Sequence, residues 1–155
     1  MNPNTRPYMR VKVQLALVNR AMNQLDEAIK HAEDMLTLNP NDNQGIRDLI
    51  IPLYIETGQY EAAQKIIERY DESTAYMAYS AALVHYHLTK NVEETKEMMK
   101  KAHTLNPYVH DYISGKKPIP HTNQEDMTTG ENSEAVVYAL NNIHLWQQIN
   151  KEIFS

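Results

Sequence analysis

The sequence predicts an all-α protein in which helix hairpins stack into a right-handed solenoid. Three observations lead to this prediction. Gly is scarce, with only 4 residues in 155, so long segments can hold a continuous helix. The tripeptide Leu-Asn-Pro occurs twice, ending at Pro40 and Pro107, a separation that fits two periods of roughly 34 residues. Between these prolines, apolar residues recur at three- and four-residue steps, as on the buried face of a helix.

The repeats divide the chain into successive helix pairs, which we treat as one domain of residues 1–155. We place them at 7–40, 43–70 and 73–106, with a linker at 115–132 and a capping helix at 133–154. The first helix is expected over Pro7–Met22, with Thr5 as its N-cap. Its apolar stripe predicts a buried face made of Tyr8, Val11, Leu15, Val18 and Met22.

Local signals mark the later helices. Ala28 and Ala32 predict a close approach between the two helices of the first pair, because small side chains let helices meet. Pro52 lies inside the next predicted helix and is expected to bend it. The third pair has N-cap candidates at Asp71–Thr74 and a turn at Lys90-Asn91.

The C-terminal segment carries one more amphipathic helix. Ser133 is its expected N-cap, and its apolar face consists of Val136, Val137, Leu140, Ile143, Trp146 and Ile149. A solenoid needs a terminal unit that covers its last exposed core, so we expect this helix to act as a cap. The alternative is that it occupies the concave groove in the place of a partner.

Composition excludes several classes of function. The net charge of −5 argues against a nucleic-acid-binding protein, which needs a basic surface. The sequence contains no Cys and no apolar run of the roughly 20 residues that a membrane span needs. We therefore expect a cytoplasmic protein without a membrane partner. The first helix is locally basic, with Arg6, Arg10, Lys12 and Arg20 and no acid.

The sequence contains none of the catalytic or metal-binding motifs that we considered. The cluster of histidines comprises His85, His87, His103, His110 and His121, but no His-Glu-x-x-His spacing occurs among them. No Gly-rich phosphate loop and no nucleophile motif is present. We expect no catalytic residue, no metal site and no cofactor, and keep a His-dependent metalloenzyme as the least favoured alternative.

The repeat pattern resembles the tetratricopeptide repeat. Three groups of residues carry the resemblance: Leu15, Ala16, Leu25, Ala28 and Pro40; Ile50, Gly58, Tyr60 and Ala63; and Leu83, Tyr86, Ala102 and Pro107. Lys12, Met35 and Thr95 depart from the pattern, so the repeats are degenerate. The resemblance implies ligand binding on the inner face of each first helix. That face maps onto Arg10, Val13, Leu17, Arg20, Arg47, Ile51, Tyr54, Met77, Val84 and His87.

A narrower resemblance covers nearly the whole chain. The stretches around Arg6–Arg10, Asn39–Leu49, Asn106–Pro120 and Gly130–Trp146 are similar to the C-terminal part of the suppression-of-tumorigenicity-seven family and its bacterial relatives. This resemblance supports the fold and implies no biochemical activity.

These observations favour a protein–protein interaction module. Its predicted ligand is a partner peptide or helix with acidic and hydrophobic residues, because the predicted groove mixes arginines with apolar side chains. The alternative is a structural scaffold, whose N-terminal edge stacks on further repeats or on a second copy of the chain.

Overall fold

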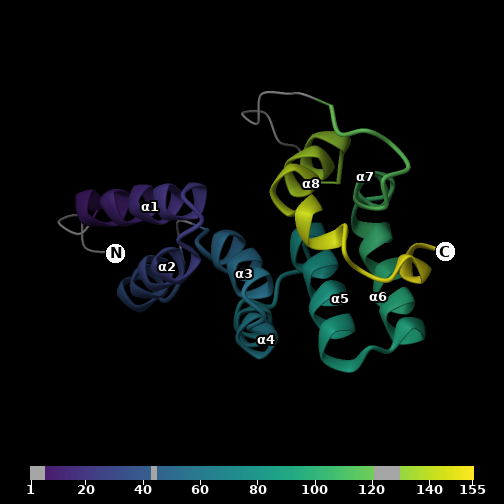
Figure 1. The fold of residues 1–155 in the computed structure, drawn as a ribbon, viewed down its shortest axis with the longest axis horizontal. Coiled ribbons are helices and arrows are strands. Elements are labelled where there is room, and N and C mark those ends of the chain that lie inside the picture. The colour runs from purple at the N-terminus through teal and green to yellow at the C-terminus, as the bar shows by residue number, and fades with distance from the viewer. Residues whose placement is uncertain (1–5, 43–44, 121–129) are drawn as a thin grey trace. The chain divides into compact units, whose positions relative to one another are not determined.

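The computed structural model describes residues 6–42, 45–120 and 130–155, with the backbone alone for Arg6, Pro7 and Met9. Every regular element in this part of the chain is a helix, which confirms the all-α prediction (Figure 1). The chain forms two compact units, residues 1–66 and 67–155. The prediction of a single domain stays a prediction, as does the N-cap at Thr5, which lies outside the described residues.

The first unit contains α1 (Arg6–Ala21), α2 (Leu25–Leu38), α3 (Arg47–Glu56) and the start of α4 (Tyr60–Arg69). Helices α1 and α2 form a hairpin, and α2 also packs on α3. Ala16, Ala28 and Ala32 are fully buried, as expected for helices that approach over small side chains. Pro52 lies inside α3, where the sequence placed it.

The predicted buried stripe of α1 is wrong. Its five residues are all exposed, whereas Ala16 on a different face of the helix is fully buried. Helix periodicity identifies an apolar face but does not state what that face contacts. Here α1 turns Ala16 and Lys12 toward α2 and leaves the stripe uncovered.

The second unit begins with the hairpin of α5 (Ala75–Thr89) and α6 (Val92–Leu105). Thr74, in the predicted capping segment, accepts at its hydroxyl from the backbone N–H of Met77 at 3.2 Å. Asn91, in the predicted turn, caps α6, and its side chain accepts from the backbone N–H of Glu94 at 3.0 Å. Lys90 has φ 55°, the left-handed conformation that ends α5.

Three further elements complete this unit: α7 (Val109–Ile113), α8 (Asn132–Trp146) and the 3₁₀ helix η2 (Lys151–Phe154). The predicted continuous helix over 133–154 is therefore interrupted between α8 and η2. Ser133 lies inside α8, and Glu131 takes the N-cap position without a side-chain cap. Trp146 and Ile153 are buried, so both parts contribute to the core.

The two Leu-Asn-Pro tripeptides end the second helix of a pair, as predicted. Asn39 and Asn106 are the C-cap residues of α2 and α6, and each donates its backbone N–H to a carbonyl four residues earlier. Both asparagines are buried. The repeated tripeptide therefore gives the same local backbone in both units.

Candidate functional site

Helix α1 exposes a row of large apolar side chains, which we call the α1 stripe. It consists of Tyr8, Val11, Leu15, Val18 and Met22, which are between 42% and 63% exposed. Leu17, on the other side of the helix, is 44% exposed. Contiguous apolar patches of this kind are uncommon on monomeric proteins and mark interaction surfaces.

The orientation of α1 is fixed by contacts with α2. The Lys12 ammonium donates to the Asp34 carboxylate at 3.0 Å and lies 3.1 Å from Nδ1 of His31. The hydrogen bond to Asp34 raises the pKa of Lys12. Lys12, which departs from the predicted repeat pattern, thus forms a polar contact between the two helices.

The four predicted groove residues of α1 lie at the surface. Arg10 and Leu17 are exposed, and Val13 and Arg20 are partly exposed. By helical spacing these four side chains share one face, on the opposite side of the helix from the α1 stripe. This helix therefore offers a ligand both a cation-bearing face and an apolar one.

The predicted groove residues of α3 are in a different environment. Ile51 and Tyr54 are buried, and the Tyr54 hydroxyl donates to Glu33 at 2.9 Å. Burial raises the pKa of Tyr54, as does this hydrogen bond. Arg47 pairs with the buried Asp42 carboxylate at 3.2 Å. That carboxylate also accepts the backbone N–H of Ile46 and of Arg47, so it holds the start of α3.

The predicted groove face of α5 is closed. Met77 and Val84 are no more than 3% exposed, and burial lowers the pKa of the half-buried His87. Ser80, which shares this face by spacing, forms a 3.3 Å hydrogen bond with Tyr138 of α8. In the same region the Asn142 side chain donates to the Tyr76 hydroxyl at 3.1 Å.

Helix α8 therefore lies against the side of α5 that the sequence assigned to the groove. Its Tyr138 ring packs edge-on against Tyr76, with centroids 4.8 Å apart, and the Trp146 indole donates to its hydroxyl at 3.2 Å. The apolar face predicted for this helix, Val136, Val137, Leu140, Ile143, Trp146 and Ile149, did not include Tyr138. The peptide-binding role of the ten predicted residues stays a prediction.

The histidines do not assemble into a metal centre in the described part of the chain, where no group of three or more metal-ligating side chains occurs. His85 instead pairs with Glu94 at 2.7 Å. His121 lies outside the described residues. Among the helices that the structure describes, none combines the length and apolar character required to cross a membrane.

Comparison with known families adds one finding. Residues 20–83 match the family model of the tetratricopeptide repeat. The match supports a tetratricopeptide-repeat protein. Tetratricopeptide repeats generally mediate protein–protein interaction. No curated protein and no solved structure matches the chain, and the narrower resemblance to the suppression-of-tumorigenicity-seven family stays a prediction.

Proposed function

We propose that this tetratricopeptide-repeat protein is an interaction module that binds an amphipathic helix or peptide of a partner protein on α1. The observation that carries the proposal is the exposure of the α1 stripe on a helix that is otherwise packed against α2. A partner helix with apolar residues at three- and four-residue steps would cover such a stripe, as in other helix-in-groove complexes.

The charge of α1 indicates the chemistry of the partner. The helix contains no acidic residue, and the ammonium of Lys12 is already paired with Asp34. Arg10 is exposed roughly a third of a turn around the helix from the centre of the stripe. Acidic residues that flank the apolar positions of a partner would pair with this guanidinium and speed association.

The second unit offers an internal precedent. There α8 packs a helix against the face of α5 that corresponds by repeat position to the Arg10–Leu17 face of α1. The chain thus already uses a first helix of a repeat to receive another helix. The equivalent face of α1, which lies on the other side of the helix from the stripe, has Arg10 and Leu17 exposed.

The test uses two labelled 18-residue amphipathic peptides with the same leucines, one flanked by Glu and one by Lys, followed by fluorescence anisotropy. We expect the Glu peptide to bind about tenfold more tightly than the Lys peptide. The double substitution Leu15→Gln/Val18→Gln should abolish this binding. A matched control is Leu105→Gln/Leu140→Gln, which changes two similarly exposed leucines of the second unit. Equal binding by both double variants would contradict the proposal.

A self-assembling scaffold is the second candidate, and the same exposed stripe favours it. Repeat proteins bury such a face by stacking one unit on the next. Sedimentation equilibrium separates the two functions. A mass that rises with concentration, and returns to the monomer value in Leu15→Gln/Val18→Gln, identifies a second copy of the chain as the occupant of the stripe.

A further inference from the structure

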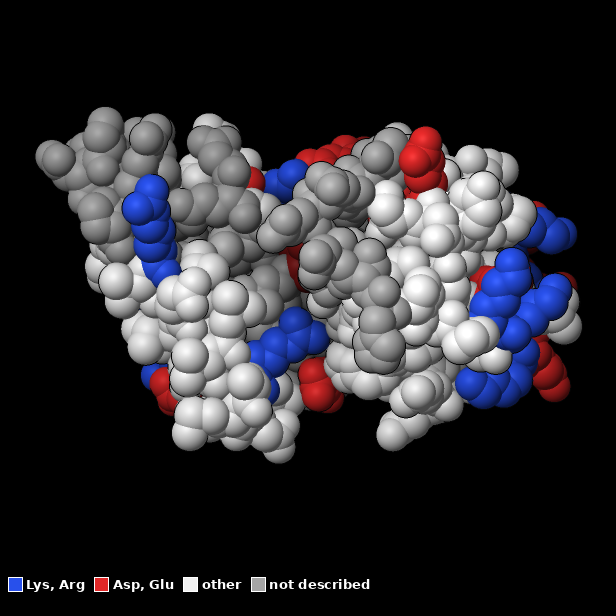
Figure 2. Space-filling view, turned by 90° about the horizontal axis from the view of Figure 1, so that it is seen from above, with Lys and Arg blue, Asp and Glu red and all other residues white. Residues whose placement is uncertain are grey.

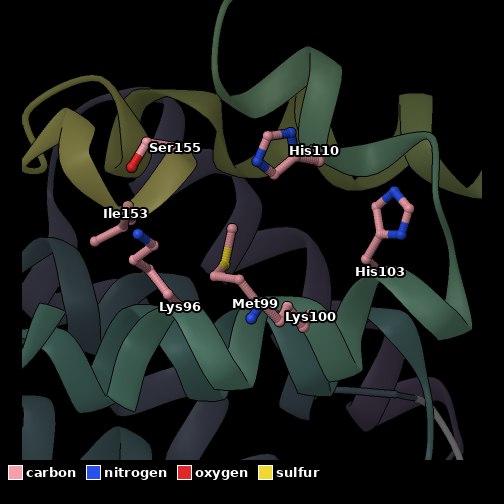
Figure 3. Close-up of a pocket in the computed structure, with 7 residues that line it drawn as sticks. All are labelled: Lys96, Met99, Lys100, His103, His110, Ile153 and Ser155. Carbon is pink, nitrogen blue, oxygen red and sulfur yellow. The ribbon is translucent and has the colours of Figure 1, made fainter. Parts of the chain in front are cut away.

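A pocket of about 310 Å³ lies within the second unit (Figure 3). It is bounded by α6, by His110 of α7 and by η2, and its lining residues are Lys96, Met99, Lys100, His103, His110, Ile153 and Ser155. This volume is at the lower end of the range found for small-molecule sites. Nothing in the repeat pattern assigns a ligand to it.

The pocket has an apolar floor and a basic rim. Met99 and Ile153 are no more than 4% exposed and form the floor. Lys96, Lys100 and His103 follow one another at helical spacing on α6, so they project from the same face as Met99. Figure 2 shows Lys and Arg side chains gathered on the part of the second unit where α6 and α7 lie, with some acidic side chains between them.

The charges around the pocket favour an anion. Among the described residues, no acidic side chain lines it. Lys100 reaches Glu97 at 3.1 Å, but this pair is exposed and therefore weak. Lys96 is only partly exposed and has no ion-pair partner in the described part of the chain. A partly desolvated ammonium without a partner attracts an anion more strongly than a fully solvated one.

The imidazole of His110 closes the rim on the side of α7. It packs edge-on against Phe154, with ring centroids 5.6 Å apart, and this contact connects α7 to η2. Asp111 lies 4.0 Å from His110, but it is also 3.6 Å from Lys117. The ring is thus held in place at the pocket by contacts on two elements.

We propose that this pocket binds a small organic anion that carries one carboxylate or phosphate group on an apolar body. The anionic group lies between Lys96 and Lys100, and the apolar body covers Met99 and Ile153. The site is separate from α1, so it gives the protein a small-molecule ligand in addition to its proposed protein partner.

The experiment titrates the full chain, labelled at the methionine methyl groups, with four probes. Benzoate and phenyl phosphate supply both parts of the ligand with different anionic groups. Inorganic phosphate supplies the charge alone, and benzyl alcohol supplies the apolar body alone. The Met99 methyl resonance, assigned from a Met99→Leu variant, reports binding at the floor. We expect benzoate or phenyl phosphate to bind at least about tenfold more tightly than inorganic phosphate or benzyl alcohol, as measured by the shift of this resonance.

The substitution Lys96→Met keeps the length of the side chain and removes its charge. It should weaken binding of the better probe about tenfold or more. The control Lys65→Met, which changes an exposed lysine of α4, should leave the binding unchanged. Lys100→Met gives a second variant should Lys96→Met prove unfolded by circular dichroism. Benzyl alcohol binding as tightly as benzoate, or affinity that survives both lysine substitutions, would overturn the proposal. So would a Met99 methyl that no probe shifts.

Discussion

The two Leu-Asn-Pro turns that follow α2 and α6, which we call corners, have the same sequence and the same backbone cap. The hydrogen-bond partners of their asparagine side chains, however, differ. The Asn106 side chain donates to the Glu131 carbonyl at 2.9 Å and to the Glu134 carboxylate at 2.8 Å. It also accepts from the backbone N–H of Tyr108 at 3.0 Å. The buried side-chain amide of Asn39 has no hydrogen-bond partner for its nitrogen.

The difference shows that the tripeptide determines the turn of the backbone. The segment that follows it determines whether the Asn side chain finds hydrogen-bond partners, and so how much the turn contributes to stability. In the second unit the start of α8 supplies both acceptors of Asn106. Its buried Glu134 also accepts from the backbone N–H of Gly130 at 3.1 Å. A buried amide without a partner costs free energy, so the first unit retains a cost that the second unit has removed.

The largest loss of stability is expected at the second corner, where the Asn106 side chain has hydrogen-bond partners for both its donors and its acceptor. Asn106→Leu removes both donors and leaves the Glu134 carboxylate buried beside an apolar side chain. We expect the free energy of unfolding to fall by about 3 kcal/mol. Urea unfolding followed by the fluorescence of Trp146, the single Trp, measures this in the second unit.

Asn39→Leu is the matched substitution in the first unit. It removes a donor that has no partner, so unfolding followed by circular dichroism should change by less than about 1 kcal/mol. Equal losses in Asn39→Leu and Asn106→Leu would show that the two corners are equivalent, and the comparison would then be wrong.

A smaller difference in unfolding free energy is expected between the Phe variants of two buried tyrosines, Tyr138 and Tyr54. Tyr138→Phe leaves the Trp146 indole N–H and the Ser80 hydroxyl buried without their partner, which should cost about 2 kcal/mol of unfolding free energy. Tyr54→Phe frees only the exposed Glu33, which water can solvate, and should cost about 1 kcal/mol or less. Urea titrations of the two variants measure both values. A greater loss in Tyr54→Phe would reverse the comparison of the units.

The sequence predicted the elements better than their contacts. The start of α5 followed from the capping residue Thr74 and the turn before α6 from Lys90-Asn91, because both signals are local. The partners of Asn106 and Asp42 depend on how segments meet in space, which no spacing rule specifies. The α1 stripe was assigned to the core because periodicity was taken as burial, although Ala16 made the contact with α2. The pocket beside α6 also required the fold, since η2 is distant from α6 in sequence.

Acid should weaken the second unit through the half-buried His110. Burial lowers the pKa of His110 below the usual value of 6.5, so the unfolded chain binds a proton before the folded chain does. The stability that neutral His110 contributes is complete above about pH 6.5 and is lost as the pH falls through the folded value. Trp146-detected unfolding between pH 7.5 and 5 should show a shallower slope for His110→Gln. An unchanged slope would remove His110 as a cause of the pH dependence.

The smallest effect is expected on α1, where the first unit departs most from the pattern of a packed repeat. Leu15 occupies a repeat position that the sequence assigned to the core, yet its side chain is 42% exposed. Leu15→Ala should therefore change the free energy of unfolding by less than about 0.5 kcal/mol, whereas a leucine in a core loses about 2–5 kcal/mol on the same substitution. A loss in the core range, measured by urea titration at low protein concentration, would mean that the stripe is buried in the folded monomer. A loss that appears only at high concentration would instead mean that a second chain covers it. Because the small expected value depends on the stripe being uncovered, this measurement tests the premise of the proposed interaction directly.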